Sequence, residues 1–277
     1  MTTIVVGYKG FIGSRVYNFL QMDQFPLIGV SRDVCDLSNR AEVFSFFETV
    51  AEPFNIIFCS VIDRGVDNSW SSFQSNIAMV KNCVDCVKKS DLIKSMVYLS
   101  SVDVYGASPV LPITENTPSN PRDFYGLAKY VSEIIFSRGL EKVCPVTILR
   151  LPGIYDAGGD TRSVVGRYIN EAKSKGTVEL QGSGAVLRDY VCVSDLCNLI
   201  MKVLNRPASG VFNVASGTSF KLTEIVERIS AKFDAKIKRS SEDKEGRSYD
   251  LVFDVSRLKQ NFGIDIRKLS TVLGSGS

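Results

Sequence analysis

The segment TIVVGYKGFIG, residues 3–13, decides the fold of this chain. Its β-branched start predicts a strand, the glycines recur every third residue, and SRVYNFLQ (14–21) has apolar residues at helical spacing. In a strand–turn–helix unit, glycines let the backbone approach a pyrophosphate, and the helix N-terminus faces its charge. The alternative is that the glycines only pack the helix against the strand. We predict a dinucleotide site formed by Gly7, Gly10, Phe11, Ile12 and Gly13.

The same alternation of strand and helix continues through the first half of the chain. β-branched runs predict strands at 26–31, 55–60, 95–101 and 145–151, and apolar spacing predicts helices at 41–50, 73–88 and 124–138. Alternating strands and helices form parallel sheets with right-handed crossovers. We therefore predict an α/β fold, a Rossmann-like doubly wound parallel sheet.

The pattern changes after residue 155, where a Gly- and Asp-rich loop, DAGGDTRS (156–163), interrupts it. We predict a dinucleotide-binding domain over 1–155 and a smaller C-terminal domain over 156–277 that is mainly substrate-binding. Some segments of the second half are expected to return to the first domain.

Bulk composition excludes several classes of function. The chain has 277 residues and a net charge of +3, too small to predict binding to nucleic acid or to a membrane surface. We see neither a membrane span nor a signal peptide, and therefore expect a cytoplasmic protein. The chain has no histidine, and Cys83 and Cys86 lie within a predicted helix, so we expect no metal site. Proton transfer must use other side chains.

Three motifs together carry a family resemblance: GYKGFIG (7–13), SSVDVYG (100–106) and YGLAK (125–129). With them, residues 3 to about 215 resemble the extended short-chain dehydrogenase/reductases, the NAD-dependent epimerase/dehydratase family of nucleotide-sugar enzymes. The resemblance implies a nucleotide-sugar substrate, a role in cell-surface polysaccharide biosynthesis, and a homodimer formed through the long helices.

Tyr125 and Lys129 are the predicted centre of catalysis. On a helix they lie one turn apart on one face. The ammonium is expected to lower the pKa of the phenol and to bind the nicotinamide ribose, while Ser101, at a strand end, shares the reacting oxygen. The alternatives are a surface pair at chance spacing and, for the whole chain, a non-catalytic dinucleotide-binding sensor.

Substrate contacts are predicted at Ser101, Val102, Asp103 and Arg188. Dehydratases of the family carry Asp-Glu after the Ser/Thr; Val102 cannot donate a proton, which disfavours dehydration. Asp103 is either a second acid or base or a structural carboxylate. By resemblance, Arg188 holds the substrate diphosphate; the alternative is an ordinary surface ion pair.

The end of the second strand bears on the cofactor. NAD enzymes usually place an acid there, which accepts from the ribose 2′-hydroxyl. Here Ser31 and Arg32 come first, suited to a 2′-phosphate, and Asp33 follows; Asp36 and Leu37 are placed to meet the adenine. We therefore favour NADP(H) over NAD(H), and reduction of a 4-keto-6-deoxy nucleotide sugar over C4 epimerisation with retained NAD.

Overall fold

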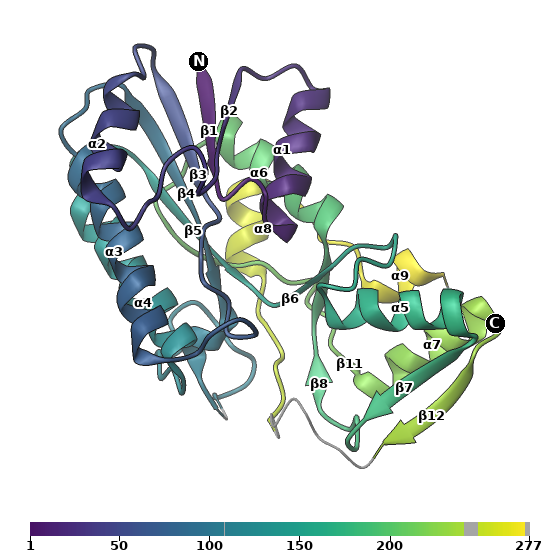
Figure 1. The fold of residues 1–277 in the computed structure, drawn as a ribbon. Helices are drawn as coiled ribbons and strands as arrows, with labels where there is room; N and C mark the ends of the chain where they lie inside the picture. The colour runs from purple at the N-terminus through teal and green to yellow at the C-terminus, as the bar shows by residue number, and fades with distance from the viewer. Residues whose placement is uncertain (108, 241–248, 275–277) are drawn as a thin grey trace. The chain divides into compact units, whose positions relative to one another are not determined.

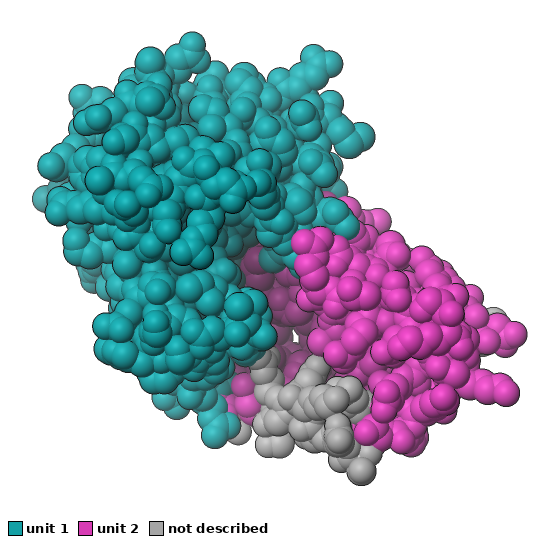
Figure 2. Space-filling view, in the orientation of Figure 1, with its two compact units in different colours: residues 1–106, 119–150, 197–212 teal, residues 107–118, 151–196, 213–277 magenta. Residues whose placement is uncertain are grey.

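The chain folds into two compact units in a computed structural model that describes residues 1–107, 109–240 and 249–274. Unit 1 comprises residues 1–106, 119–150 and 197–212; unit 2 comprises 107–118, 151–196 and 213–277 (Figure 2). Each unit is described by itself below. That they divide cofactor binding from substrate binding stays a prediction.

Unit 1 is built on a six-stranded sheet with the order β10-β5-β4-β3-β1-β2. Its strands are β1 (Thr2–Val6), β2 (Leu27–Val30), β3 (Phe54–Phe58), β4 (Ile93–Ser101), β5 (Val146–Leu151) and β10 (Gly210–Asn213). The pairs β1–β2, β1–β3 and β3–β4 are parallel. The predicted Rossmann-like sheet is confirmed, because its buried β-branched runs form the strands that their pattern indicates.

Helices cover both faces of this sheet, as Figure 1 shows. They are α1 (Phe11–Met22), α2 (Arg40–Glu48), α3 (Trp70–Val87), α4 (Phe124–Leu140) and α6 (Val193–Asn205). The helices α2, α3 and α4 lie on one face, and α1 and α6 lie on the other. Buried apolar side chains of β1, β3, β4, α3 and α4 form a core that packs α3 and α4 against the sheet.

The parallel register brings distant parts of the sequence to one edge of the sheet. Val6 at the end of β1 pairs with Val30 and with Phe58, so β1, β2 and β3 end side by side. The adjacent β4 ends at Ser101 and continues into a short 3₁₀ helix, η1 (Val102–Tyr105). Ligands of open α/β sheets bind outside these carboxyl ends.

Unit 2 combines short strand pairs with helices. Its elements are β6 (Gly153–Tyr155), α5 (Val164–Lys175), β7 (Thr177–Gln181), β8 (Leu187–Arg188), β9 (Tyr190–Cys192), β11 (Phe220–Lys221), α7 (Leu222–Phe233), β12 (Lys236–Ser240), α8 (Ser256–Phe262) and α9 (Leu269–Leu273). The strands pair as β6–β9, β7–β12 and β8–β11. Apolar side chains of α5, α7 and α9 form a core of their own. In neither unit does any helix of the described residues have the length and apolar character that a bilayer span requires.

Candidate active site

The glycine turn between β1 and α1 requires glycine at two positions. Gly7 has a φ of 83°, and a Cβ there would lie 2.8 Å from the backbone nitrogen of Ser60. A Cβ on Gly13 would lie 2.1 Å from the carbonyl oxygen of Gly7. Gly10, the N-cap of α1, brings no side chain to cap the helix. The turn therefore leaves backbone N–H groups and the N-terminus of α1 uncovered by side chains, and such groups bind the negative charge of a pyrophosphate.

The loop after β2 places opposite charges beside this turn. Asp33 pairs with Lys9 of the glycine turn, and hydrogen bonding to Lys9 lowers the pKa of Asp33. Arg32 is 85% exposed, with its Nε 3.4 Å from a carboxylate oxygen of Asp36. The hydroxyl of Ser31 is buried and has no hydrogen-bond partner among the described residues. At the strand end, the exposed guanidinium of Arg32 thus pairs with Asp36, and Asp33 pairs with Lys9.

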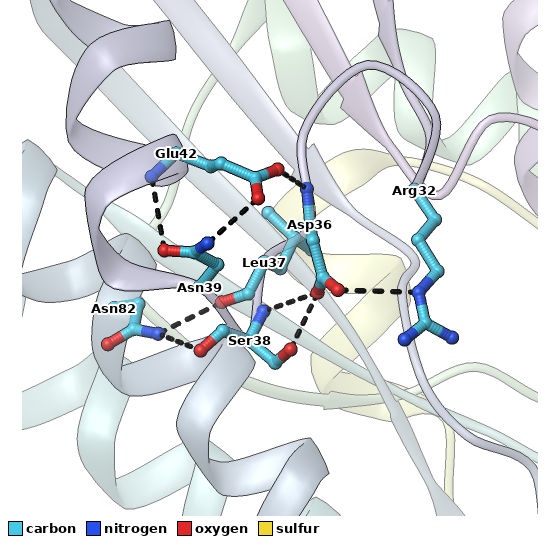
Figure 3. A network of polar contacts seen from close by, with 7 residues as sticks. All are labelled: Arg32, Asp36, Leu37, Ser38, Asn39, Glu42 and Asn82. Atoms are coloured by element: carbon cyan, nitrogen blue, oxygen red, sulfur yellow. Dashed lines mark hydrogen bonds and ion pairs between the residues drawn. The ribbon is translucent and has the colours of Figure 1, made fainter.

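The rest of this loop is fixed by polar contacts (Figure 3). Asp36 accepts from the backbone nitrogen and the hydroxyl of Ser38, at 2.9 and 2.6 Å, and its own backbone N–H donates to Glu42. Asn82 of α3 donates to the carbonyl oxygens of Leu37 and Ser38. The Leu37 side chain is buried in the core, so any contribution of Leu37 to the predicted adenine site would come from its backbone.

Ser101, Tyr125 and Lys129 come together beside the carboxyl end of β4. Asp123 caps α4 by accepting from the Gly126 backbone nitrogen at 2.7 Å, which fixes where the helix begins. Ser101 hydrogen-bonds the Tyr125 hydroxyl. Lys129 is buried, with its Nζ 5.8 Å from the centre of the Tyr125 ring. The spatial grouping predicted from YGLAK and SSVDVYG is present, and the catalytic roles stay predictions.

The net shift in the pKa of Tyr125 is upward, although Lys129 was expected to lower it. Burial raises the pKa of Tyr125 above its usual value, and Asp103 and Asp63 raise it further. The Lys129 ammonium donates to the carbonyl oxygen of Leu99 at 2.6 Å, and burial lowers the pKa of Lys129 to about 8. One of the three N–H donors of the ammonium thus binds the backbone, and desolvation is the largest influence on the pKa of Tyr125. The charge of Arg64 lowers the pKa of Tyr125.

Arg64 is a residue of this site that the sequence did not suggest. One of its nitrogens lies 2.6 Å from the Asp103 carboxylate and another 3.7 Å from that of Asp123. Its guanidinium lies over the Tyr125 ring, 5.1 Å from the ring centre. Asp103 also accepts from the Ser101 hydroxyl at 3.0 Å. Val102 is 5% exposed, and its predicted contact with substrate stays a prediction.

A buried ion pair supports the site from behind. Glu133, one turn after Lys129 on α4, makes two hydrogen bonds with Arg150 of β5, at 3.0 and 2.7 Å. The Ser100 hydroxyl, next to Ser101, donates to the same carboxylate at 2.5 Å. Both charged side chains are 5% exposed. The pair thus joins α4, β4 and β5 at the point where the catalytic candidates project.

Arg188 lies in unit 2, at the end of β8, and is buried. Its Nη1 donates to the carbonyl oxygens of Leu187 and Tyr249, at 2.9 and 2.6 Å, and the guanidinium lies over the Tyr249 ring. This guanidinium is buried and donates to backbone carbonyl oxygens, whereas the guanidinium of an ordinary surface ion pair is exposed to solvent. Its contact with a diphosphate stays a prediction.

Comparison with known proteins identifies the family of this chain. The sequence profile of the NAD dependent epimerase/dehydratase family matches residues 3–215, from the glycine turn through β10. The chain belongs to this family. Family membership makes it an enzyme of the short-chain dehydrogenase/reductase type, which argues against the non-catalytic sensor.

Relatives within the epimerase/dehydratase family include two informative proteins. A putative UDP-glucose 4-epimerase of Methanocaldococcus jannaschii is 24% identical over 279 residues, covering 92% of this chain and 90% of that protein. A dTDP-6-deoxy-L-talose 4-dehydrogenase (NAD(+)) of Aggregatibacter actinomycetemcomitans is 34% identical over 143 residues, covering 50% of this chain and 52% of that protein. Nucleotide-sugar epimerases and dehydrogenases are thus both among them.

A solved structure of the family confirms the fold over the whole chain. The UDP-glucose 4-epimerase of Thermotoga maritima, determined with UDP-glucose, has a TM-score of 0.87 at 20% identity. The match covers 99% of this chain and 96% of that structure. At this identity the likeness establishes the fold, while the reaction must be argued from the site itself.

Proposed function

We propose that this enzyme reduces the 4-keto group of a 4-keto-6-deoxy nucleotide sugar, with NADPH as the hydride donor. The observation that carries the proposal is the charge arrangement after β2. Arg32 is an exposed cation at the strand end, and Asp33 is engaged by Lys9. A 2′-phosphate is attracted by such an exposed guanidinium and repelled by a free carboxylate. A reductase draws on the NADPH pool, whereas an epimerase keeps its cofactor and regenerates it.

The chain's own residues fit a dinucleotide. The turn from Gly7 to Gly13 would hold the pyrophosphate against the N-terminus of α1. Arg32 would hold the 2′-phosphate, and the buried hydroxyl of Ser31 would contact it only after a change of side-chain rotamer. When bound, the dinucleotide supplies the hydride.

Tyr125 is the proposed general acid of the reduction. It would give its proton to the sugar carbonyl oxygen as the carbonyl carbon accepts the hydride; the Tyr125 O–H bond breaks, and an O–H bond forms on the sugar. Ser101, hydrogen-bonded to Tyr125, would orient the same oxygen. Tyr125 is left as a phenolate, which must then be reprotonated from solvent.

The alternative function is nucleotide-sugar C4 epimerisation with retained NAD. Two observations favour it: epimerases are among the relatives, and Asp33 lies close enough to the strand end to accept from a ribose if Lys9 released it. The 4-dehydrogenase relative carries NAD(+) in its name, so oxidoreductase activity in this family does not itself require NADP. Cofactor affinity therefore tests the phosphate-binding role, and net consumption of the cofactor separates the two functions.

Arg32→Ala should weaken NADPH binding about tenfold or more, because a charge-assisted contact to the 2′-phosphate contributes about 1.5–3 kcal/mol. NADH affinity should be unchanged. Dissociation constants of wild type and variant for both cofactors, measured by calorimetry, test this. Arg40→Ala, an exposed arginine on α2, is the matched control and should change neither constant.

Lys9→Met gives a second view of the same loop, because it frees Asp33 from its partner. The ratio of NADPH to NADH affinity should then fall. A wild-type preference for NADH, or an unchanged NADPH affinity in Arg32→Ala, would reject the phosphate-binding role and remove the observation that favours the reductase over the epimerase.

Arg188→Ala should raise the KM for a nucleotide sugar at least tenfold, because a forked charge-assisted contact to the diphosphate is lost. Dinucleotide affinity should not change, since Arg188 lies in unit 2 and the glycine turn lies in unit 1. Steady-state kinetics and calorimetry on the same preparations measure both. Equal losses of sugar and dinucleotide binding would count against the assignment and indicate a structural role.

A further inference from the structure

Arg64 is placed to act on Tyr125 rather than on substrate. It lies in the loop between β3 and α3, a segment without any of the motifs that define the site. Its guanidinium lies over the Tyr125 ring at 5.1 Å, within the range of a cation–π contact. The Arg64 side chain is 35% exposed, so solvent only partly screens its charge.

Two carboxylates hold Arg64 in this position. Asp103, at 2.6 Å, is 8% exposed and is itself fixed by the Ser101 hydroxyl. Asp123, at 3.7 Å, caps the helix that carries Tyr125. The guanidinium is therefore tied both to η1, which carries Asp103, and to the start of α4, and these two contacts set its place over the ring.

The charges around Tyr125 show what Arg64 contributes. Asp63 and Asp103 face the phenol and oppose its ionisation, and Asp123 lies at the same helix end. Lys129 is a second cation near the ring, and its Nζ donates one hydrogen bond to the Leu99 carbonyl oxygen. Without Arg64, a phenolate at Tyr125 would face these carboxylates with less positive charge nearby.

We propose that Arg64 is a positioning residue of the active site, which stabilises the phenolate that Tyr125 forms when it gives up its proton. The inference rests on the proposed catalytic role of Tyr125. It adds the cation that makes this role feasible in a site crowded with carboxylates. Arg64 acts through Tyr125 and through Asp103, whose orientation toward Ser101 it also fixes.

The ionisation of Tyr125 can be followed without any sugar. Protein labelled with ¹³Cζ-tyrosine and saturated with NADP⁺ is titrated by NMR from pH 7 upward until the Tyr125 resonance shows its midpoint, and Tyr125→Phe assigns the resonance. In Arg64→Gln the midpoint should rise by about one pH unit or more relative to wild type, as expected for losing an opposite charge at this distance. Arg64→Lys should recover part of the shift, and Arg122→Gln, an exposed arginine in the loop before α4, should not move it.

Equal midpoints in wild type and Arg64→Gln would overturn the inference. The experiment needs no turnover, so it separates this inference from the choice of sugar. If the midpoint moves but no 4-keto sugar is reduced, Arg64 keeps its role and the proposed reaction fails. If sugar is reduced at a rate that depends on Tyr125 while the midpoint stays in place, the reaction stands and the role of Arg64 fails.

Discussion

Tyr125→Phe should lower the rate of sugar reduction at least a hundredfold. A positioned general acid contributes about 10²–10⁴-fold to a proton-transfer step, and phenylalanine removes the proton while keeping the ring. The ring also provides the contacts with Arg64 and Lys129, so the surroundings of the site should be preserved. The loss should appear in kcat, with NADPH affinity unchanged.

The measurement follows NADPH oxidation by absorbance with a 4-keto-6-deoxy nucleotide sugar. Tyr130→Phe is the matched control: it removes a phenolic hydroxyl from the same helix five residues on and should leave kcat near the wild-type value. If Tyr125→Phe retains turnover within about tenfold of wild type, the general-acid role is wrong.

Arg150→Met should destabilise unit 1 by about 3–5 kcal/mol, because it leaves the Glu133 carboxylate buried without its charged partner. Burial works against the charge of Arg150, but its hydrogen bonds to Glu133 more than offset this and raise the pKa of Arg150. The single tryptophan of the chain, Trp70, lies in unit 1, so its fluorescence reports unfolding of that unit in urea.

Two further variants make this prediction specific. The double variant Glu133→Gln with Arg150→Met should recover part of the lost stability, because no unpaired charge then remains. Lys81→Met breaks an exposed ion pair with Asp85 on α3 and should cost less than about 1 kcal/mol. An Arg150→Met protein as stable as Lys81→Met would show that the buried pair does not hold these elements together.

The parts of the fold that the sequence predicted are those that depend on local pattern. Residues 3–6 are β-branched and become part of β1; of the glycines that follow, Gly7 has the positive φ and Gly13 the close approach that glycine tolerates. Because parallel strands end at one edge, the position of Ser101 at the end of β4 also placed it near the start of α4.

The features that the sequence did not reveal depend on burial and on contacts between distant residues. Arg64 lies in a loop without periodicity, 39 positions before Asp103, and only the folded chain brings them together. The net pKa of Tyr125 was misjudged because helical spacing gives the proximity of Lys129 but says nothing of desolvation. Glu133 and Arg150 were read as part of a helix and a strand, and their pairing required the tertiary arrangement.

The stoichiometry of NADPH oxidation tests the proposed reaction most directly. Wild-type enzyme is incubated with NADPH deuterated at the transferring position and with UDP-, dTDP-, GDP- and CDP-linked 4-keto-6-deoxy sugars. We predict that one of these sugars is reduced, that NADPH is consumed in an amount equal to the product, and that the deuterium is found at C4. Interconversion of C4 epimers with catalytic NAD⁺, and no net consumption of NADPH with any of the four sugars, would contradict the account.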